Sequence, residues 1–314
     1  MPTNLKSTAI ATTPAIAKPK TKQSPSLFSA GHRACAGCGQ AIAARTVANA
    51  LGPDTIIANA TGCLEVTTTP YPESAWGMPW IHSLFENPAA VASGISAALK
   101  QKKKDKQIKV VAQGGDGGTF DIGFGLVSGM WERGENILYI CYDTEAYSNT
   151  GMQASGATPW AANTTTTPAG EKAIGSHQNK KDMIAIALAH GVKYAAQCTA
   201  GYLEDIETKV KKAREIEGPA YIQILTPCVP GWRIKPDQAM LAARLAAQTG
   251  LYPLLEYENG ALTKVMKVPA SRIKVEEYLK LQGRFAHLFK NPEGVEIIKH
   301  IQSLADANIE RYAL

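Results

Sequence analysis

Five short apolar runs, separated by helical patterns, constrain the fold of this chain more than any other feature. They lie at 55–62, 108–115, 136–144, 192–199 and 220–228. Most are apolar on both faces, which is typical of strands in a parallel sheet that is covered on both sides. Helical patterns lie between them, at 87–100, 120–134, 181–191 and 202–218. The alternation predicts an α/β domain with a doubly wound, mostly parallel sheet.

The two ends of the chain differ from this alternating region. Residues 1–29 are rich in Thr, Ala, Pro and Lys, and we expect an extended arm that stays mobile or lies on a partner subunit. After residue 235 the pattern changes to charged helical segments, which predict a C-terminal helical extension over 236–314. The domain that carries the function is therefore expected at 30–235.

Charge and hydropathy exclude several classes of protein. A net charge of +6 over 314 residues is too small and diffuse to indicate nucleic-acid binding. No apolar run approaches the roughly 18 residues that a membrane span needs, and the first residues lack the apolar core of a signal peptide. We therefore expect a cytoplasmic protein with no nucleic-acid or membrane partner. In that compartment the six cysteines are not expected to form structural disulfides.

A glycine-rich segment, QGGDGGTFDIGFG, joins the second apolar run to the helical pattern at 120–134. It does not match the dinucleotide fingerprint G-x-G-x-x-G, because Phe120 stands where the third glycine is required. It does place Asp116 between glycines at a helix N-terminus, which suits a phosphate group and its Mg²⁺. A plain tight turn is the alternative. Further oxygen ligands are expected from YDTEAYSNTG, because neighbouring parallel strands open into one crevice.

Two cysteines, Cys35 and Cys38, form a C-x-x-C pair in GHRACAGCGQ. The pair is compatible with half of a zinc site, a redox dithiol or half of an iron–sulfur cage. The chain has no second C-x-x-C or H-x-x-H pair, which disfavours zinc. A thioredoxin-type dithiol is also disfavoured, because the pair precedes the first clear strand instead of opening a helix after one. Cys141 and Cys198 lie inside predicted strands and are expected to be buried apolar residues.

Seven segments together resemble the β subunits of 2-oxoacid:ferredoxin oxidoreductases, especially the pyruvate type. They are GHRACAGCG, NATGCLEVTTTPYP, PWIHSLFENPAAVASG, GDGGTFDIG, YDTEAYSNTG, ATPWAANTTTTP and TPCVPGW, and they span about 30–235. The usual thiamine diphosphate motif ends in Asn-Asn, whereas this chain has Ser148-Asn149-Thr150, as in that branch. The resemblance implies thiamine-dependent oxidative decarboxylation of pyruvate with coenzyme A. In the related oxalate oxidoreductase branch it implies oxalate cleavage without coenzyme A.

The resemblance also implies thiamine diphosphate, Mg²⁺ and one 4Fe–4S cluster as cofactors of the 30–235 domain. The implied cluster ligands are Cys35, Cys38, Cys63 and Cys228. The implied magnesium ligands are Asp116, Thr144 and the carbonyl of Ala146. The implied cofactor-binding residues are Gln40, Cys63, Gly115, Asp116, Gly117, Gly118, Thr144, Glu145, Ala146, Tyr147, Ser148 and Asn149. Asn149 is the expected catalytic residue, as a polar group that faces the reacting carbon.

Partner subunits follow from the same resemblance. In the family, the glutamate that activates the aminopyrimidine ring belongs to another domain, so this chain is expected to be inactive alone. Other subunits would supply that domain and further clusters, and ferredoxin would accept the electrons. Two competing interpretations are a non-redox thiamine decarboxylase or carboligase and an electron-transfer subunit that binds a cluster without thiamine chemistry.

Overall fold

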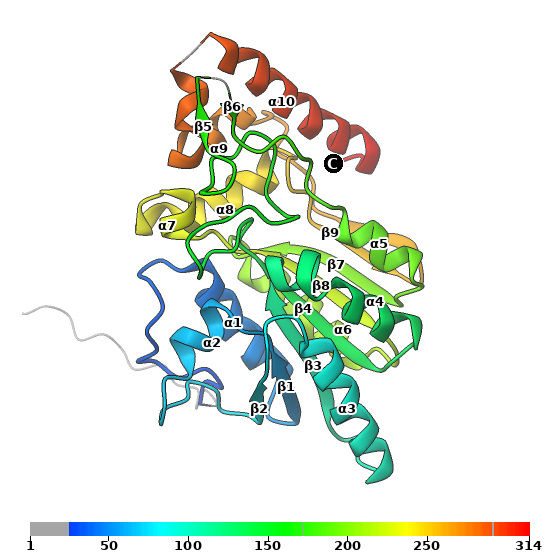
Figure 1. The fold of residues 1–314 in the computed structure, drawn as a ribbon. Helices are drawn as coiled ribbons and strands as arrows, with labels where there is room; N and C mark the ends of the chain where they lie inside the picture. Colours follow the sequence, from blue (N-terminus) through cyan, green and yellow to red (C-terminus); the bar gives the residue numbers. More distant parts are fainter. Residues whose placement is uncertain (1–24, 172, 291) are drawn as a thin grey trace, which may run out of the picture.

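The computed structural model describes residues 25–171, 173–290 and 292–314, and its centre is an eight-stranded sheet (Figure 1). The strand order is β10-β9-β7-β8-β4-β3-β1-β2. The strands are β1 (Thr55–Asn59), β2 (Trp80–His82), β3 (Lys109–Gly115), β4 (Ile137–Asp143), β7 (Tyr194–Thr199), β8 (Ala220–Leu225), β9 (Leu255–Glu258) and β10 (Ala261–Val265). The strands from β7 to β2 are parallel, while β9 and β10 are antiparallel to their neighbours. The predicted doubly wound, mostly parallel sheet is therefore confirmed.

Helices cover both faces of the sheet. One face carries α1 (Gly39–Leu51) and α6 (Leu203–Glu215), and the other carries α3 (Pro88–Gln101), α4 (Phe124–Glu132) and α5 (Met183–Ala189). Strand β4 is buried along its whole length, which explains why the residues before its final Asp143 are apolar or aromatic. Leu138, Ile140 and Tyr142 enter the core under α1 and α6, whereas Tyr139 and Cys141 enter the core under α3 and α4.

The C-terminal part packs around its own apolar core and against the end of the sheet (Figure 1). Its helices are α7 (Val229–Trp232), η2 (Pro236–Gln238), α8 (Ala239–Gln248), α9 (Val275–Lys280), η3 (Gly283–Phe289) and α10 (Glu293–Tyr312). The predicted helical extension is incomplete, because residues 255–265 form the β9–β10 hairpin that extends the main sheet. Asn259 and Gly260 both have positive φ at the turn, which is the backbone that a tight hairpin needs.

Little of the predicted N-terminal arm lies within the described residues. Of residues 1–29, the structure describes 25–29, and there Phe28 is buried. Its ring packs edge-on against Trp76, and the two residues form an isolated β-bridge. The start of the described chain is therefore attached to the loop before β2.

The carboxyl ends of β1, β3 and β4 lie side by side and lead into the segments that the sequence singled out. Strand β1 leads into α2 (Cys63–Thr68), and β3 leads through Asp116 into a π-helical turn, η1 (Gly117–Ile122). The short strands β5 (Ala169–Gly170) and β6 (Ala173–Ile174) form a separate ribbon. Among the described helices, none has the length and apolar character that crossing a membrane requires.

Candidate functional site

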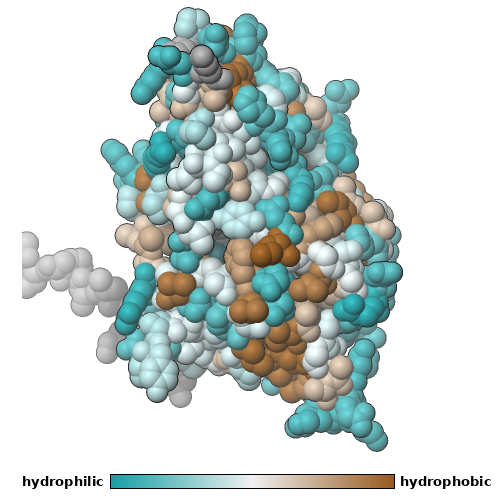
Figure 2. Space-filling view, in the orientation of Figure 1, coloured by the Kyte–Doolittle hydropathy of each residue, from teal (hydrophilic) through white to brown (hydrophobic). Residues whose placement is uncertain are grey.

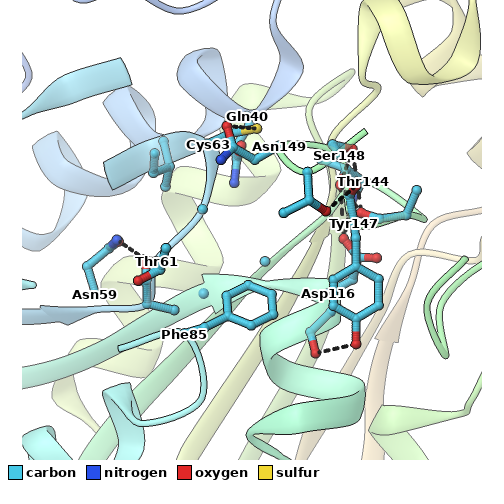
Figure 3. Close-up of a pocket in the computed structure, with 18 residues that line it drawn as sticks. Gln40, Asn59, Thr61, Cys63, Phe85, Asp116, Thr144, Tyr147, Ser148 and Asn149 are labelled. Carbon is cyan, nitrogen blue, oxygen red and sulfur yellow. Dashed lines mark hydrogen bonds between the residues drawn. The ribbon is translucent and has the colours of Figure 1, made fainter. Parts of the chain in front are cut away.

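A cavity of about 300 Å³ opens at the carboxyl ends of β1, β3 and β4 (Figure 3). Its walls come from residues 59–64 at the end of β1, 114–117 at the end of β3, and the loop that follows β4, together with Gln40 and Phe85. Most of the predicted cofactor-binding residues line it: Gln40, Cys63, Gly115, Asp116, Gly117, Thr144, Ala146, Tyr147, Ser148 and Asn149. The parallel sheet therefore brings the predicted segments to one crevice, as its topology requires.

Asp116 is the centre of a group of oxygen atoms on one wall of this cavity. Its Oδ1 accepts hydrogen bonds from the Thr144 amide (3.0 Å) and the Thr144 hydroxyl (2.9 Å), and its Oδ2 accepts one from Ser155 (2.6 Å). The Thr144 hydroxyl also lies 3.0 Å from the Ala146 carbonyl and accepts a bond from Ser148. One hydroxyl proton cannot serve both the Asp116 and the Ala146 oxygens. The group is therefore rich in acceptors, which suits a hard cation.

Asp116 itself is 1 % exposed, and the donors that reach it are hydroxyls and an amide. Burial raises the pKa of its carboxyl group, and the neighbouring Asp143 raises it further. A buried carboxylate in such surroundings is costly unless a positive charge comes close to it. The residues present thus fit the magnesium site that the resemblance implies.

Asp143 and Glu145, on either side of Thr144, have cationic partners. Lys180 Nζ lies 2.5 Å from Asp143 Oδ2 and 2.9 Å from Glu145 Oε1, and Arg284 Nη2 lies 2.5 Å from Glu145 Oε2. Burial raises the pKa of Glu145, but Lys180 and Arg284 outweigh it, so the net shift is downward. The Glu145 side chain lines a second cavity on the far side of the loop and does not line the first.

The glycines after β3 allow close packing around the site. A Cβ on Gly117 would overlap the ring of Tyr147, and a Cβ on Gly118 would lie 3.0 Å from the Phe85 carbonyl. Tyr147 is fixed by a 3.0 Å hydrogen bond from its hydroxyl to Asp121 Oδ2, and its ring packs against Phe85. Gly118 therefore supports the wall from behind without lining the cavity.

The four predicted cluster cysteines lie around the first turn of α1 and the cavity. Cys63 lines the cavity, with its Sγ 3.9 Å from Asn149 Oδ1, and Cys38 Sγ accepts the Ala41 amide at 3.5 Å. Burial raises the pKa of Cys63 to about 12, and the nearby Cys228, Cys38 and Cys35 thiols add to this effect. The other three thiols are thus near enough to Cys63 to raise its pKa, which is compatible with a shared set of four thiolate ligands around an iron–sulfur cluster.

The remaining cysteines and the rest of the described chain add no further thiol ligand. Cys141 and Cys198 are fully buried inside β4 and β7, as predicted. In the described ranges, no three His, Cys, Asp or Glu side chains are arranged to hold a single metal ion.

Several residues of the site had not been predicted. Asn59, Thr61 and Phe85 line the cavity, and Lys180 and Arg284 lie behind its wall. Asn59 is the last residue of β1 and Thr61 follows it closely, as Asp116 follows β3, so the topology rule could have found them. No local pattern indicates Arg284, which is 139 positions from its partner Glu145 in the sequence.

The comparisons with known proteins first define the class of the domain. Residues 60–224 match the family described as thiamine pyrophosphate enzyme, C-terminal TPP binding domain. This range includes the GDG segment and the loop after β4. A solved 2-oxoglutarate:ferredoxin oxidoreductase from Magnetococcus marinus has a similar fold, with a TM-score of 0.56 and 24% identity. The match covers 81% of this chain and 88% of that chain.

Curated relatives define the family more narrowly. The chain is 54% identical to pyruvate synthase subunit PorB of Methanocaldococcus jannaschii, over 89% of this chain and 94% of that protein. It is 50% identical to the subunit of that name in Methanosarcina barkeri, over 94% of this chain and 99% of that protein. Ketoisovalerate oxidoreductase subunit VorB of Pyrococcus abyssi is 45% identical, over 87% of this chain and 88% of that protein. The chain therefore belongs to the family of 2-oxoacid:ferredoxin oxidoreductase β subunits, and the predicted resemblance is confirmed.

Proposed function

We propose that this chain is the β subunit of a pyruvate:ferredoxin oxidoreductase that acts only with its partner subunits. The observation that carries the proposal is the acceptor-rich group of Asp116, Thr144 and Ala146 on one wall of a cavity whose other wall includes Cys63. The cavity thus has a candidate cation site on one wall and one of the four clustered cysteines on the other. This combination suits thiamine diphosphate with Mg²⁺ beside an iron–sulfur cluster.

The magnesium ligands would be the side chains of Asp116 and Thr144 and the carbonyl of Ala146. The Thr144 amide donates to Asp116 Oδ1, and the Thr144 hydroxyl lies within 3.0 Å of both the Asp116 and the Ala146 oxygens, so the three groups are already close together. The backbone of Gly115 and Gly117 would face the diphosphate at the start of η1. Bound thiamine diphosphate supplies a nucleophilic carbon for addition to a 2-oxo group and an electron sink for loss of carbon dioxide.

Asn149, Phe85 and Gln40 would act on the reacting end of the cavity. In Figure 3 the Asn149 side chain lies beside Cys63 on the cavity wall, with its Oδ1 3.9 Å from Cys63 Sγ. A polar group in that position can orient a 2-oxoacid. Phe85 contributes an apolar wall that excludes water from part of the cavity.

The cluster ligands would be Cys35, Cys38, Cys63 and Cys228. A bound 4Fe–4S cluster supplies one-electron transfer toward ferredoxin. Cys63 would have two roles, because its side chain lies both among the four thiols and on the cavity wall. The Ala41 amide bonded to Cys38 and the Gly231 amide bonded to Cys228 would stabilise thiolate charge.

Pyruvate is the substrate we propose, with coenzyme A as acyl acceptor. The relatives with 54% and 50% identity are named pyruvate synthase subunits. The relative at 45% is named for ketoisovalerate. The assay therefore compares the two substrates directly.

The test is a steady-state assay of the complex, purified without oxygen, with pyruvate, ketoisovalerate, 2-oxoglutarate and oxalate, each with and without coenzyme A. Pyruvate with coenzyme A should give the highest kcat/KM for ferredoxin reduction. Oxalate turnover without coenzyme A would instead assign the chain to the oxalate branch. Iron, sulfide and thiamine contents of the same complex test whether it holds both cofactors. A thiamine enzyme without iron would be a non-redox enzyme, and a cluster without thiamine would be an electron carrier.

A further inference from the structure

The loop that carries the proposed magnesium ligands is held from behind by the C-terminal part of the chain. Arg284 lies in η3, and its guanidinium is 2.5 Å from Glu145 Oε2. Its side chain is only 3 % exposed, and its Nε donates to Gln282 Oε1 at 2.9 Å. The Arg284 carbonyl in turn accepts the amide of Asn163 at 3.0 Å. Arg284 is thus fixed on several sides before it reaches the loop.

Arg284 also contacts the loop by a second route. Its guanidinium lies 4.0 Å from the centre of the Trp232 ring, and Trp232 Nε1 donates a 2.9 Å hydrogen bond to the Thr144 carbonyl. Trp232 ends α7, the short helix that Cys228 caps. One buried arginine therefore supports two successive residues of the loop, Thr144 through Trp232 and Glu145 through an ion pair.

The conformation of Glu145 explains why such support is needed. Glu145 has φ 61°, in the left-handed region that residues other than glycine seldom adopt. Its side chain lies behind the loop, while Thr144 and Ala146, on either side of it, line the front cavity. The backbone oxygen of Glu145 accepts a 2.9 Å hydrogen bond from Thr158. If residue 145 relaxed, the Thr144 hydroxyl and the Ala146 carbonyl would no longer face the same point.

We propose that Arg284 is a positioning residue for the magnesium ligands, acting through Glu145 and Trp232, with Lys180 as the second cation on Glu145. The inference rests on the proposed function, since it assumes that Thr144 and Ala146 bind Mg²⁺. It gives the C-terminal part of the chain a role in the cofactor site. Residues behind a metal ligand commonly change metal affinity about 10- to 100-fold when they are removed.

The experiment titrates Mg²⁺ into the purified, metal-stripped complex in the presence of saturating thiamine diphosphate, by calorimetry. Arg284→Met should raise the Kd for Mg²⁺ about tenfold or more. Arg284→Lys keeps the charge but loses the fork and the planar stacking, so its Kd should lie between those of wild type and Arg284→Met. Glu145→Gln, which is nearly isosteric, should raise the Kd in the same direction. It is the second variant if Arg284→Met does not assemble.

The matched control is Lys209→Met. Lys209 is as buried as Arg284, at 3 % exposure of its side chain, and pairs with Asp205 at 2.8 Å on α6. Its removal should lower the thermal stability of the complex and leave the Kd for Mg²⁺ unchanged. An unchanged Kd in both Arg284→Met and Glu145→Gln would overturn the inference, and so would an equal rise in Lys209→Met. Failure of the wild-type complex to bind Mg²⁺ with thiamine diphosphate would overturn the proposed function itself.

Discussion

Asp116 and Asp143 are both buried at the ends of neighbouring strands, but only Asp143 has a lysine against it. Lys180 compensates the charge of Asp143, whereas hydroxyls and an amide surround Asp116. Burial raises the pKa of Asp116, and repulsion from Asp143 adds to the rise. The difference favours a structural role for Asp143, whereas the proposed function places a cation beside Asp116, where it would stabilise the charged carboxylate.

Asp116→Asn should therefore separate cofactor binding from folding. We expect the complex to lose Mg²⁺-dependent retention of thiamine diphosphate by about tenfold or more. The melting temperature without cofactor should stay the same or rise, because a buried charge has been removed. Thiamine content after desalting and thermal unfolding are the measurements. Full retention with wild-type turnover would remove Asp116 from the site.

Lys109 offers a pH test at the opposite end of the sheet. Its Nζ donates to Asn136 Oδ1 and to the Ile216 carbonyl, both at 2.8 Å. Burial lowers its pKa from 10.5 to about 8. Between these values the unfolded chain binds more protons than the folded chain, so the contribution of Lys109 to stability rises with pH. Between about pH 8 and pH 10.5, the contribution of Lys109 to the free energy of unfolding should rise by roughly 3 kcal/mol.

Lys109→Met should abolish that rise. The free energy of unfolding, measured by denaturant titration from about pH 7.5 to about pH 10.5, should change in favour of wild type relative to the variant by roughly 3 kcal/mol. Other groups titrate in both proteins and cancel in the difference. A difference that stays constant with pH would show that the Lys109 amine does not titrate in this range.

Among the secondary-structure elements, those buried on both faces could be predicted from the sequence, and the edge hairpin could not. Strands β3, β4 and β8 are mostly apolar because helices cover both faces of the sheet, so their pattern reflects the fold directly. Strand β9 lies near the edge and alternates Leu255, Glu256, Tyr257 and Glu258. Lys212 of α6 bonds both glutamates, at 2.5 and 2.6 Å, and this long-range pairing has no local signal. The local pattern that indicates the hairpin is the Asn259-Gly260 pair, which is typical of a tight turn between two strands.

The position of a cysteine relative to its strand predicts its chemistry. Cys228 comes after β8 at the start of α7 and is partly exposed, whereas Cys198 is fully buried within β7. Cys228→Ser should make the proposed cluster labile, with loss of iron and of visible absorbance. Cys198→Ser should keep the cluster, although burying a hydroxyl there costs about 1–3 kcal/mol of stability. Loss of iron from Cys198→Ser with retention in Cys228→Ser would mean that the fourth ligand is misassigned.

At the scale of the whole molecule, the sequence predicts those residues of the candidate site whose positions follow from the order of strands in the sheet. The carboxyl ends of adjacent parallel strands must meet, so Asp116 and Thr144 had to lie close together once the sheet was predicted. Arg284 and Trp232 come from a part of the chain whose packing depends on the third apolar core. Their contacts with the loop after β4 depend on how the C-terminal helices pack against the sheet. The residue pattern within each helix does not specify that packing.

Apolar side chains remain exposed beside the cavity. Leu84 is 62 % exposed, Ile122 is 56 % exposed and Leu126 is 39 % exposed. The loop of Leu84 packs against η1, since the Phe85 carbonyl would meet a Cβ on Gly118. Figure 2 shows apolar surface gathered on this face of the molecule. Contiguous apolar surface at the mouth of a site is typical of a contact with another chain.

Ile122→Glu should therefore weaken assembly with the partner subunits while leaving this chain folded. A charge placed in an apolar interface must lose its water on association, which is costly without a matching cation. Because Ile122 is exposed in the single chain, the melting temperature of that chain should change little. Leu241→Glu is the control, since Leu241 is 46 % exposed on α8, away from the cavity.

The measurement is pyruvate-dependent ferredoxin reduction after each purified chain has been mixed with its partner subunits. Wild type and Leu241→Glu should gain activity on mixing, and Ile122→Glu should need a higher subunit concentration. If the wild-type chain alone were as active as the mixed complex, the site would be complete without a partner.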